Sequence, residues 1–153
     1  MTDAAIVELG QSGLEQLRAL LTANHLPDDD CADQLQGICG IFEGAELIVA
    51  GGLEQAAPYA LLRSVVVRRD HRGRGLAKRI TGYLLHRAES QGVAAVYLLT
   101  ETAQDFFAKL GFRRVEREAV PAAVRRTRQF ASLCPQSASC MCIDFPRARA
   151  AAR

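Results

Sequence analysis

Hydrophobic residues recur at helical spacing in two stretches of the chain. The first stretch carries leucines three or four residues apart, namely Leu14, Leu17, Leu20 and Leu21. Asn24 and Pro27 end that helix, because proline cannot continue it. The second stretch runs from Gly75 to Gln91 with apolar residues one turn apart, and Gly92 follows at the usual stop position. The pattern therefore predicts two amphipathic helices.

Short alternating or continuous hydrophobic runs predict the strands, at residues 6–9, 38–42, 46–53, 59–67, 95–99, 112–117 and 139–145. Shorter helices are expected over residues 30–35, with Asp30 as the N-cap, over 103–110 and after Pro121. An early antiparallel meander that leads into a strand–helix–strand crossover describes one mixed α/β domain. We expect this domain to span residues 1–146, with a frayed low-complexity tail over 147–153.

The composition agrees with one globular domain, since 49% of the 153 residues are hydrophobic. No apolar run reaches the ~18 residues that span a bilayer, and the N-terminus lacks the order of a signal peptide. We therefore expect a cytoplasmic protein that does not bind membranes. The net charge of +2 gives no reason to expect nucleic-acid binding. The basic charge is nevertheless concentrated, because residues 63–79 hold seven basic side chains against one acidic residue, Asp70.

The chain has five cysteines, which is an odd number, and no two of them form a Cys-x-x-Cys pair. A disulfide framework and a metal site are therefore not expected, and reduced cysteines that serve as small packing residues are favoured. Thiol-based binding of a metalloid through Cys134, Cys140 and Cys142 is the alternative.

The stretch from Arg63 to Ala77 holds the most informative pattern. A β-branched strand over Val65–Val67 runs into a turn that contains Gly73 and Gly75, and this turn opens directly into a helix. Glycines let backbone N–H groups approach an anion, and the helix directs its positive dipole end to the same point. Further charge comes from Arg72, Arg74, Lys78 and Arg79. The pattern predicts a pyrophosphate site, with a glycine turn beside a solvated basic face as the alternative.

The ligand of that site is not expected to be ATP or NAD. The Gly-Lys-Ser/Thr ending of ATP-binding loops and the three-glycine dinucleotide fingerprint are both absent. Instead, Arg72–Ala77 resembles the Arg/Gln-x-x-Gly-x-Gly/Ala loop of the GNAT superfamily of N-acetyltransferases, and Val65–Val67 resembles its fourth strand. Ala103–Phe112 is similar to the superfamily's Ala-x-x-Phe-Tyr-x-Lys-Leu-Gly-Phe segment. The resemblance implies a single GNAT-like domain with a mixed, mostly antiparallel sheet, splayed central parallel strands and flanking helices.

The resemblance also implies acetyl-CoA as the co-substrate, bound between the splayed fourth and fifth strands, and no metal. Strand backbone would pair with the pantetheine arm, and the glycine turn would hold the pyrophosphate. Thr100 occupies a position where the family often has Asn. The cofactor-binding residues implied in this way are Val65, Val66, Val67, Arg72, Gly73, Arg74, Gly75, Leu76, Ala77, Lys78, Thr100 and Phe106.

Three segments resemble a subgroup that holds bacterial arsenic-resistance N-acetyltransferases and the glutamate N-acetyltransferase domain: Leu62–Val67, Tyr97–Thr100 and Phe130–Pro135. This resemblance implies a small-molecule amine acceptor, the amino group of arsinothricin or a related glutamate mimic, and a role in detoxification. The alternatives are glutamate or another amino acid as acceptor, and a non-catalytic acetyl-CoA-binding sensor. Family habit also suggests a homodimer.

The catalytic groups follow from what acetyl transfer requires. The backbone N–H of Val66 is a candidate donor to the developing oxyanion. The superfamily's frequent Tyr falls at Phe107, so Cys134 is the candidate that protonates the departing thiolate, with Ser132 as the alternative donor. Glu43 is the candidate general base through water, and Glu54 is a second choice. A solvated strand-end carboxylate is the alternative for each.

The acceptor-binding candidates lie at the start of the same strand. Arg63 can pair bidentately with a carboxylate, phosphinate or arsonate-like group, and Ser64 can add a hydrogen bond. Both side chains can face one side only if the strand bulges there, and a surface salt bridge is the alternative for Arg63. Phe107 completes the candidate substrate-binding residues. His71 is expected to be a loop residue and His86 a helix-surface residue, neither with a catalytic role.

Overall fold

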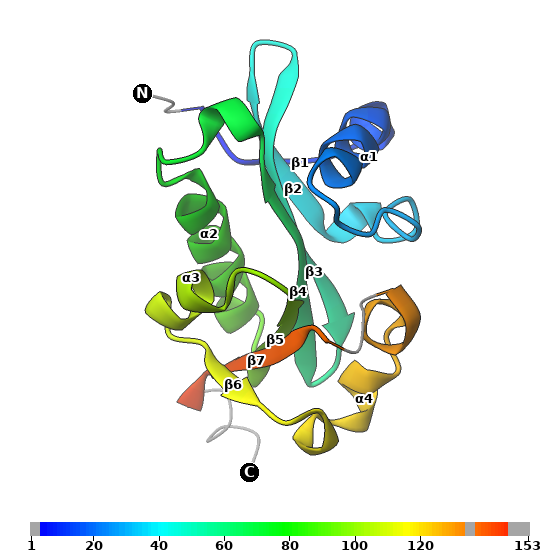
Figure 1. The fold of residues 1–153 in the computed structure, drawn as a ribbon, viewed down its shortest axis with the longest axis vertical. Coiled ribbons are helices and arrows are strands. Elements are labelled where there is room, and N and C mark those ends of the chain that lie inside the picture. The colour runs from blue at the N-terminus through cyan, green and yellow to red at the C-terminus, as the bar shows by residue number, and fades with distance from the viewer. Residues whose placement is uncertain (1–3, 134–136, 147–153) are drawn as a thin grey trace. The chain divides into compact units, whose positions relative to one another are not determined.

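The computed structural model describes residues 4–133 and 137–146, without the side chains of residues 132 and 133. The strands are β1 (Val7–Glu8), β2 (Ile38–Glu43), β3 (Glu46–Ala56), β4 (Tyr59–Val67), β5 (Ala95–Thr100), β6 (Arg113–Val115) and β7 (Ser139–Asp144). The α-helices are α1 (Leu14–Ala23), α2 (Leu76–Ser90), α3 (Gln104–Lys109) and α4 (Ala122–Arg125) (Figure 1). The remaining helical turns are η1 (Gln11–Gly13), η2 (Leu35–Gly37), η3 (Arg69–His71), η4 (Arg117–Ala119) and η5 (Gln129–Leu133).

The strands form one mixed sheet in the order β1-β2-β3-β4-β5-β7-β6. Neighbouring strands pair antiparallel at β1–β2, β2–β3, β5–β7 and β6–β7, whereas β4 and β5 are parallel. The expected α/β class with a mostly antiparallel sheet is therefore confirmed. The domain contains two compact units: the chain up to Leu53 with Arg63–Leu84, and Glu54–Leu62 with the chain from Leu85 onward.

The first unit is built around the leucine face of α1. All four leucines that the helical pattern singled out are buried, and they belong to a core made of Leu9, Leu14, Leu17, Leu20, Leu21, Cys31, Leu35, Ile38, Leu47, Ala50 and Val66. Gln16, on the same helix, joins it to the β2–β3 hairpin, since its Nε2 donates to the carbonyl of Ala45 (3.0 Å) and its Oε1 accepts from the N–H of Leu47 (2.8 Å). The position of this hairpin matters because Glu43 and Glu46 lie at its end.

The structure corrects the helix expected over residues 30–35. Those residues form turns, and the short 3₁₀ helix η2 follows at Leu35–Gly37. The carboxylate of Asp30 does not cap a helix, because it is hydrogen bonded to the guanidinium of Arg63. The two edge strands β1 and β6 are also shorter than their hydrophobic runs.

The expected irregularity in β4 is present. Ser64 has a φ of +58°, a backbone angle that residues other than glycine rarely adopt. The alternation of exposed and buried faces breaks at this point, because Arg63 and Ser64 are consecutive and both buried. Nε of Arg63 donates to Oγ of Ser64 at 3.4 Å, so the two side chains lie on the same side of the strand.

The second unit is built on β5, β6 and β7. Its core consists of Ala56, Leu61, Ala95, Tyr97, Val120, Val124, Phe130, Cys140 and Cys142. The parallel ladder between β4 and β5 contains two pairs, Ala60–Val96 and Leu61–Tyr97. Both of these β4 residues belong to the second unit, like β5 itself. Among the residues that the structure describes, no helix is long and apolar enough to cross a membrane.

Candidate active site

The turn between β4 and α2 has the geometry of an anion-binding loop. We call residues Arg72–Ala77 the glycine loop. Gly73 and Gly75 have φ angles of +80° and +75°, which favour glycine. Apart from the adjacent residues, no heavy atom lies within 4 Å of the position that a Cβ would take at either glycine. Backbone N–H groups at the loop are therefore open to a ligand on this side.

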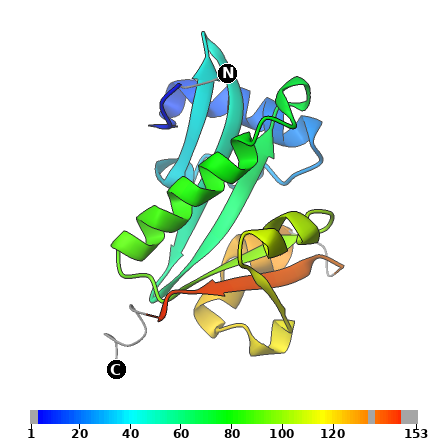
Figure 2. The same cartoon turned by 90° about the vertical axis from the view of Figure 1, so that its left-hand side faces the viewer.

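The loop leads directly into the N-terminus of α2 (Figure 2). The N–H of Arg79 is hydrogen bonded to the carbonyl of Gly75 at 3.0 Å, which closes the first turn. By helix geometry, the N–H groups of Leu76, Ala77 and Lys78 have no carbonyl partner within the helix. These groups and the helix dipole favour an anion at this end of α2.

Exposed cations surround the glycine loop, since Arg72, Arg74, Lys78 and Arg79 are all exposed. The guanidinium of Arg72 is hydrogen bonded to Oδ1 of Asn24 at the end of α1, and Arg79 donates to the carbonyl of Ala4 at 2.6 Å. The backbone of Arg72 is thereby held near α1. The sequence places Asn24 only at the end of a helix and does not predict its hydrogen bond with Arg72.

Four charged residues and His71 form a connected cluster beside the loop. The Nδ1 of His71 lies 2.8 Å from Oδ1 of Asp70, and its Nε2 lies 3.1 Å from Oε1 of Glu43. Nε of Arg68 lies 3.0 Å from the same Asp70 oxygen, and its Nη1 is hydrogen bonded to Glu46. His71 lies in the short turn η3, and it is buried, with only 7% of the residue exposed.

These contacts shift the pKa values of the cluster so that the charged form of each group is favoured. The hydrogen bond to Asp70, and then that to Glu43, raises the pKa of His71 above its ordinary value of 6.5. The hydrogen bond to His71 lowers the pKa of Asp70. The hydrogen bond to Glu46 raises the pKa of Arg68. Glu43, the candidate general base, is thus hydrogen bonded to His71, the residue before the glycine loop. The side chain of Glu43 is 54% exposed.

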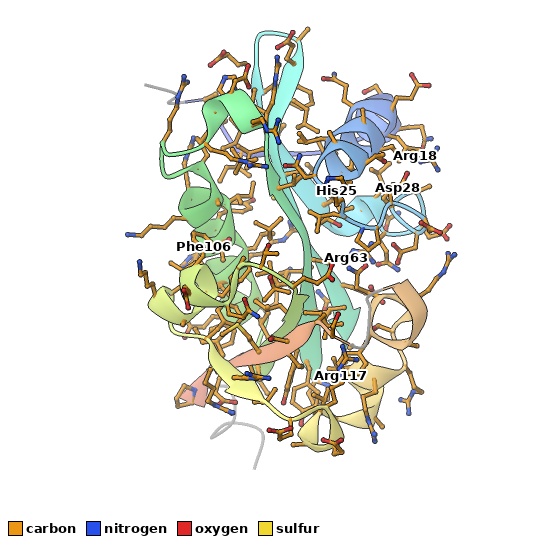
Figure 3. The ribbon with its side chains drawn as sticks, viewed as in Figure 1. Arg18, His25, Asp28, Arg63, Phe106 and Arg117 are labelled. Carbon is orange, nitrogen blue, oxygen red and sulfur yellow. The ribbon has the colours of Figure 1, made fainter. Side chains whose placement is uncertain are left out.

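Arg63, which Figure 3 labels, forms a buried ion pair with Asp30 at the irregularity of β4. Nη1 of Arg63 donates to Oδ2 of Asp30 at 2.6 Å, and Nη2 donates to Oδ1. The two residues are 3% and 2% exposed, so the pair is not the surface salt bridge considered from the sequence. Asp30 was missed because it lies in a run of three aspartates that is typical of a solvated loop. Ser64 completes the group through its contact with Nε.

The remaining candidates on β4 alternate as a strand requires. Val66 is buried in the core of the first unit, and Val65 and Val67 are half-buried on the opposite face. The N–H of Arg68, directly after the strand, is hydrogen bonded to the carbonyl of Ile48 at 2.8 Å.

The second unit positions the candidates that follow β5. Oγ1 of Thr100 accepts from the N–H of Ala103 at 3.0 Å, at the turn before α3. Phe106 is half-buried on α3 (Figure 3), and its ring meets that of Phe107 edge to face, with centroids 5.0 Å apart. Phe107 also contacts Phe112 at 5.6 Å and is buried. Phe112 is itself buried and packs in the core.

None of the four cysteines in the described residues forms a disulfide, and all four are buried: Cys31, Cys39, Cys140 and Cys142. Burial raises the pKa of Cys140 to about 11, which keeps its thiol protonated at neutral pH. The candidate proton donor Cys134 lies outside the described residues. Within residues 4–133 and 137–146, no group of three His, Cys, Asp or Glu side chains is arranged to hold a metal ion.

Several solved structures share this fold. Rv2747 from Mycobacterium tuberculosis, in complex with CoA, has a TM-score of 0.78 and 18% identity, over 92% of this chain and 99% of that one. N-acetylglutamate synthase from Neisseria gonorrhoeae, complexed with coenzyme A and N-acetyl-glutamate, has a TM-score of 0.80 and 12% identity, over 94% of this chain and 35% of that one. PaiA N-acetyltransferase from Thermoplasma acidophilum, in complex with coenzyme A, has a TM-score of 0.71 and 14% identity, over 94% and 100%.

A sequence model of the acetyltransferase (GNAT) family matches residues 15–112. This range contains the glycine loop and the Ala103–Phe112 segment, the two motifs that carry the resemblance in the sequence. Because the match spans more than half of the chain and the fold agrees with it, the chain belongs to the acetyltransferase (GNAT) family and is an acetyl-CoA-dependent N-acetyltransferase.

Proposed function

We propose that this enzyme acetylates the amino group of a small amino-acid-like acceptor, arsinothricin or a related glutamate mimic, and thereby contributes to arsenic resistance. The observation that carries the proposal is the buried guanidinium of Arg63 beside Ser64. Asp30 accepts from both Nη groups and holds this guanidinium in a fixed orientation, from which it can donate a charge-assisted hydrogen bond to a carboxylate, phosphinate or arsonate-like group. The three segments similar to the arsenic-resistance subgroup, and the fold shared with N-acetylglutamate synthase, point to the same acceptor class.

The proposal assigns acetyl-CoA to the glycine loop and β4. The pyrophosphate accepts hydrogen bonds from the loop and from the first turn of α2, and exposed Arg74 and Lys78 add charge. Backbone groups of Val65 and Val67 pair with the pantetheine arm, as an added strand would. Thr100 and Phe106 remain the further cofactor-binding residues that the resemblance to the family implies.

In the proposed reaction, the neutral amine attacks the thioester carbonyl carbon, and the C–S bond breaks as the amide forms. The N–H of Val66 stabilises the oxyanion of the tetrahedral intermediate. Glu43 removes the amine proton through a water, which its exposed side chain allows. The thiolate takes its proton from Cys134 or from water. The buried ring of Phe107 borders the acceptor.

The first test is mass-spectrometric detection of acetylated product. We expect incubation with acetyl-CoA to acetylate arsinothricin and phosphinothricin, with little product from glutamate, polyamines or aminoglycosides. Mass detection avoids the background that the protein's own thiols give in a thiol-dye assay. Efficient acetylation of glutamate would replace the detoxifying role with the amino-acid alternative. CoA binding without product on any amine would favour the sensor.

Arg63→Lys tests the acceptor contact directly. Lysine keeps a positive charge beside Asp30, but it loses the planar fork that binds an acid group bidentately. We expect the KM for the acceptor to rise about tenfold or more, the effect of losing one charge-assisted hydrogen bond. The KM for acetyl-CoA should change less than about twofold. Arg69→Lys, at an exposed arginine of η3, is the matched control. An unchanged acceptor KM in Arg63→Lys would remove Arg63 from the acceptor site.

A further inference from the structure

His71 lies where the chain enters the glycine loop and contacts carboxylates on both sides of its ring. It is the last residue of η3, directly before Arg72. One ring nitrogen is hydrogen bonded to Asp70, its neighbour in sequence, and the other to Glu43 at the end of β2. The ring therefore attaches the start of the loop to the β2–β3 hairpin.

The two contacts require the ring to be a cation. An ionised carboxylate only accepts hydrogen bonds, and a neutral imidazole carries one N–H donor. Both contacts, at 2.8 and 3.1 Å, are hydrogen bonds together only when both ring nitrogens are protonated. A neutral ring would present a lone pair to one of the two carboxylates.

The charged groups around the ring keep this arrangement in place. Arg68 bridges Asp70 to Glu46 on β3, so the pair of hairpin carboxylates Glu43 and Glu46 is connected to the turn twice. The charged residues that face this cluster are Glu43 from β2, Glu46 from β3, and Arg68 and Asp70 from the turn itself. Asp70 accepts from both Arg68 and His71 through the same Oδ1.

We propose that His71 is a positioning residue for acetyl-CoA: as an imidazolium it joins Glu43 to Asp70 and fixes the turn from which the glycine loop begins. This inference rests on the proposed binding of the CoA pyrophosphate by that loop. Loss of the proton breaks one of the two carboxylate contacts and weakens the connection between the start of the loop and the hairpin, which Arg68 then maintains alone through Glu46. CoA affinity is therefore lower when the ring is neutral.

The direction of the pH effect follows from the raised pKa of His71. The imidazolium contacts are complete below about 6.5, the ordinary histidine pKa, and are lost as the pH rises through the higher pKa of the folded protein. The dissociation constant of CoA should accordingly increase on the alkaline side of neutrality.

Calorimetric titration of the full chain with dephospho-CoA between about pH 6 and 9 tests this. Dephospho-CoA is the probe because the 3′-phosphate of CoA itself titrates near pH 6, as phosphate monoesters do. We expect the dissociation constant to rise about fivefold or more over the range, a typical coupling between two sites. His86→Gln, at an exposed histidine of α2, should leave that rise unchanged.

Two variants separate positioning from a general structural role. His71→Gln cannot donate to both carboxylates, so binding should be weak and independent of pH. In Glu43→Gln, the new amide can donate to a neutral ring whose other nitrogen donates to Asp70. This variant should therefore keep high affinity at alkaline pH and flatten the profile. A lower kcat in Glu43→Gln with the wild-type binding profile would mean that Glu43 acts as the base and does not hold His71.

A flat binding profile in the wild-type protein would overturn the inference, and so would the wild-type rise in His71→Gln. Failure of the wild-type protein to bind dephospho-CoA or CoA at any pH is a different result. It would reject the proposed role of the glycine loop, and the role of His71 with it.

Discussion

Asp30→Ala is expected to lower the free energy of unfolding by about 3–5 kcal/mol, the usual cost of removing one partner from a buried ion pair. The guanidinium of Arg63 would remain 3% exposed without the carboxylate that accepts its two Nη hydrogen bonds. Equilibrium urea unfolding measures this loss. Asp29→Ala, at the exposed aspartate next in sequence, should change stability by less than about 0.5 kcal/mol.

A double variant identifies the source of the loss. In Asp30→Leu combined with Arg63→Met, no charge remains buried, so we expect most of the stability to return. The double variant should still be inactive on the acceptor, because it lacks the guanidinium. If Asp30→Ala were no less stable than Asp29→Ala, the pair would not be buried in solution and the orientation assigned to Arg63 would be wrong.

Gly75→Ala is expected to weaken CoA binding about tenfold or more, the effect of losing a charge-assisted hydrogen bond to the pyrophosphate. The Cβ has open space in the ligand-free protein, so a clash arises only when an anion approaches the backbone. The φ of +75° adds backbone strain of about 1–2 kcal/mol. Calorimetric titration with CoA and urea unfolding separate the two effects.

Gly92→Ala is the matched control for this variant. Gly92 follows α2 at its other end with a φ of +80°, and its Cβ position is equally open. Both variants should therefore lose similar stability, and only Gly75→Ala should lose affinity for CoA. Equal affinities in the two variants would show that the glycine loop does not approach the pyrophosphate.

The glycine loop, which is proposed to bind the cofactor, could be predicted from local sequence. Gly73, Gly75 and the apolar face of α2 are close together in the chain, and the loop they form depends on backbone angles and helix periodicity. The irregularity at Ser64 meets the condition stated from the sequence, namely that Arg63 and Ser64 can face one side only if the strand bulges there. These features need few distant contacts, so a motif is enough to predict them.

The contacts of Arg63 and His71 with their carboxylate partners could not be predicted in this way. Arg63 and Asp30 are separated by 33 positions, and Glu43 and His71 by 28. The sequence alone assigns Asp30 to a helix cap and His71 to a loop, because a single polar residue usually serves such a role.

By itself, the sequence determined the α/β class, the amphipathic helices and the glycine loop before α2, because hydrophobic periodicity and glycine act over a few residues. Only the tertiary structure decided that a loop aspartate is buried against Arg63 and that two carboxylates enclose His71. The physical reason is that ion pairing depends on distance in space. The fold, in which β4 lies beside β3, brings together side chains that are far apart in the sequence and belong to no common motif.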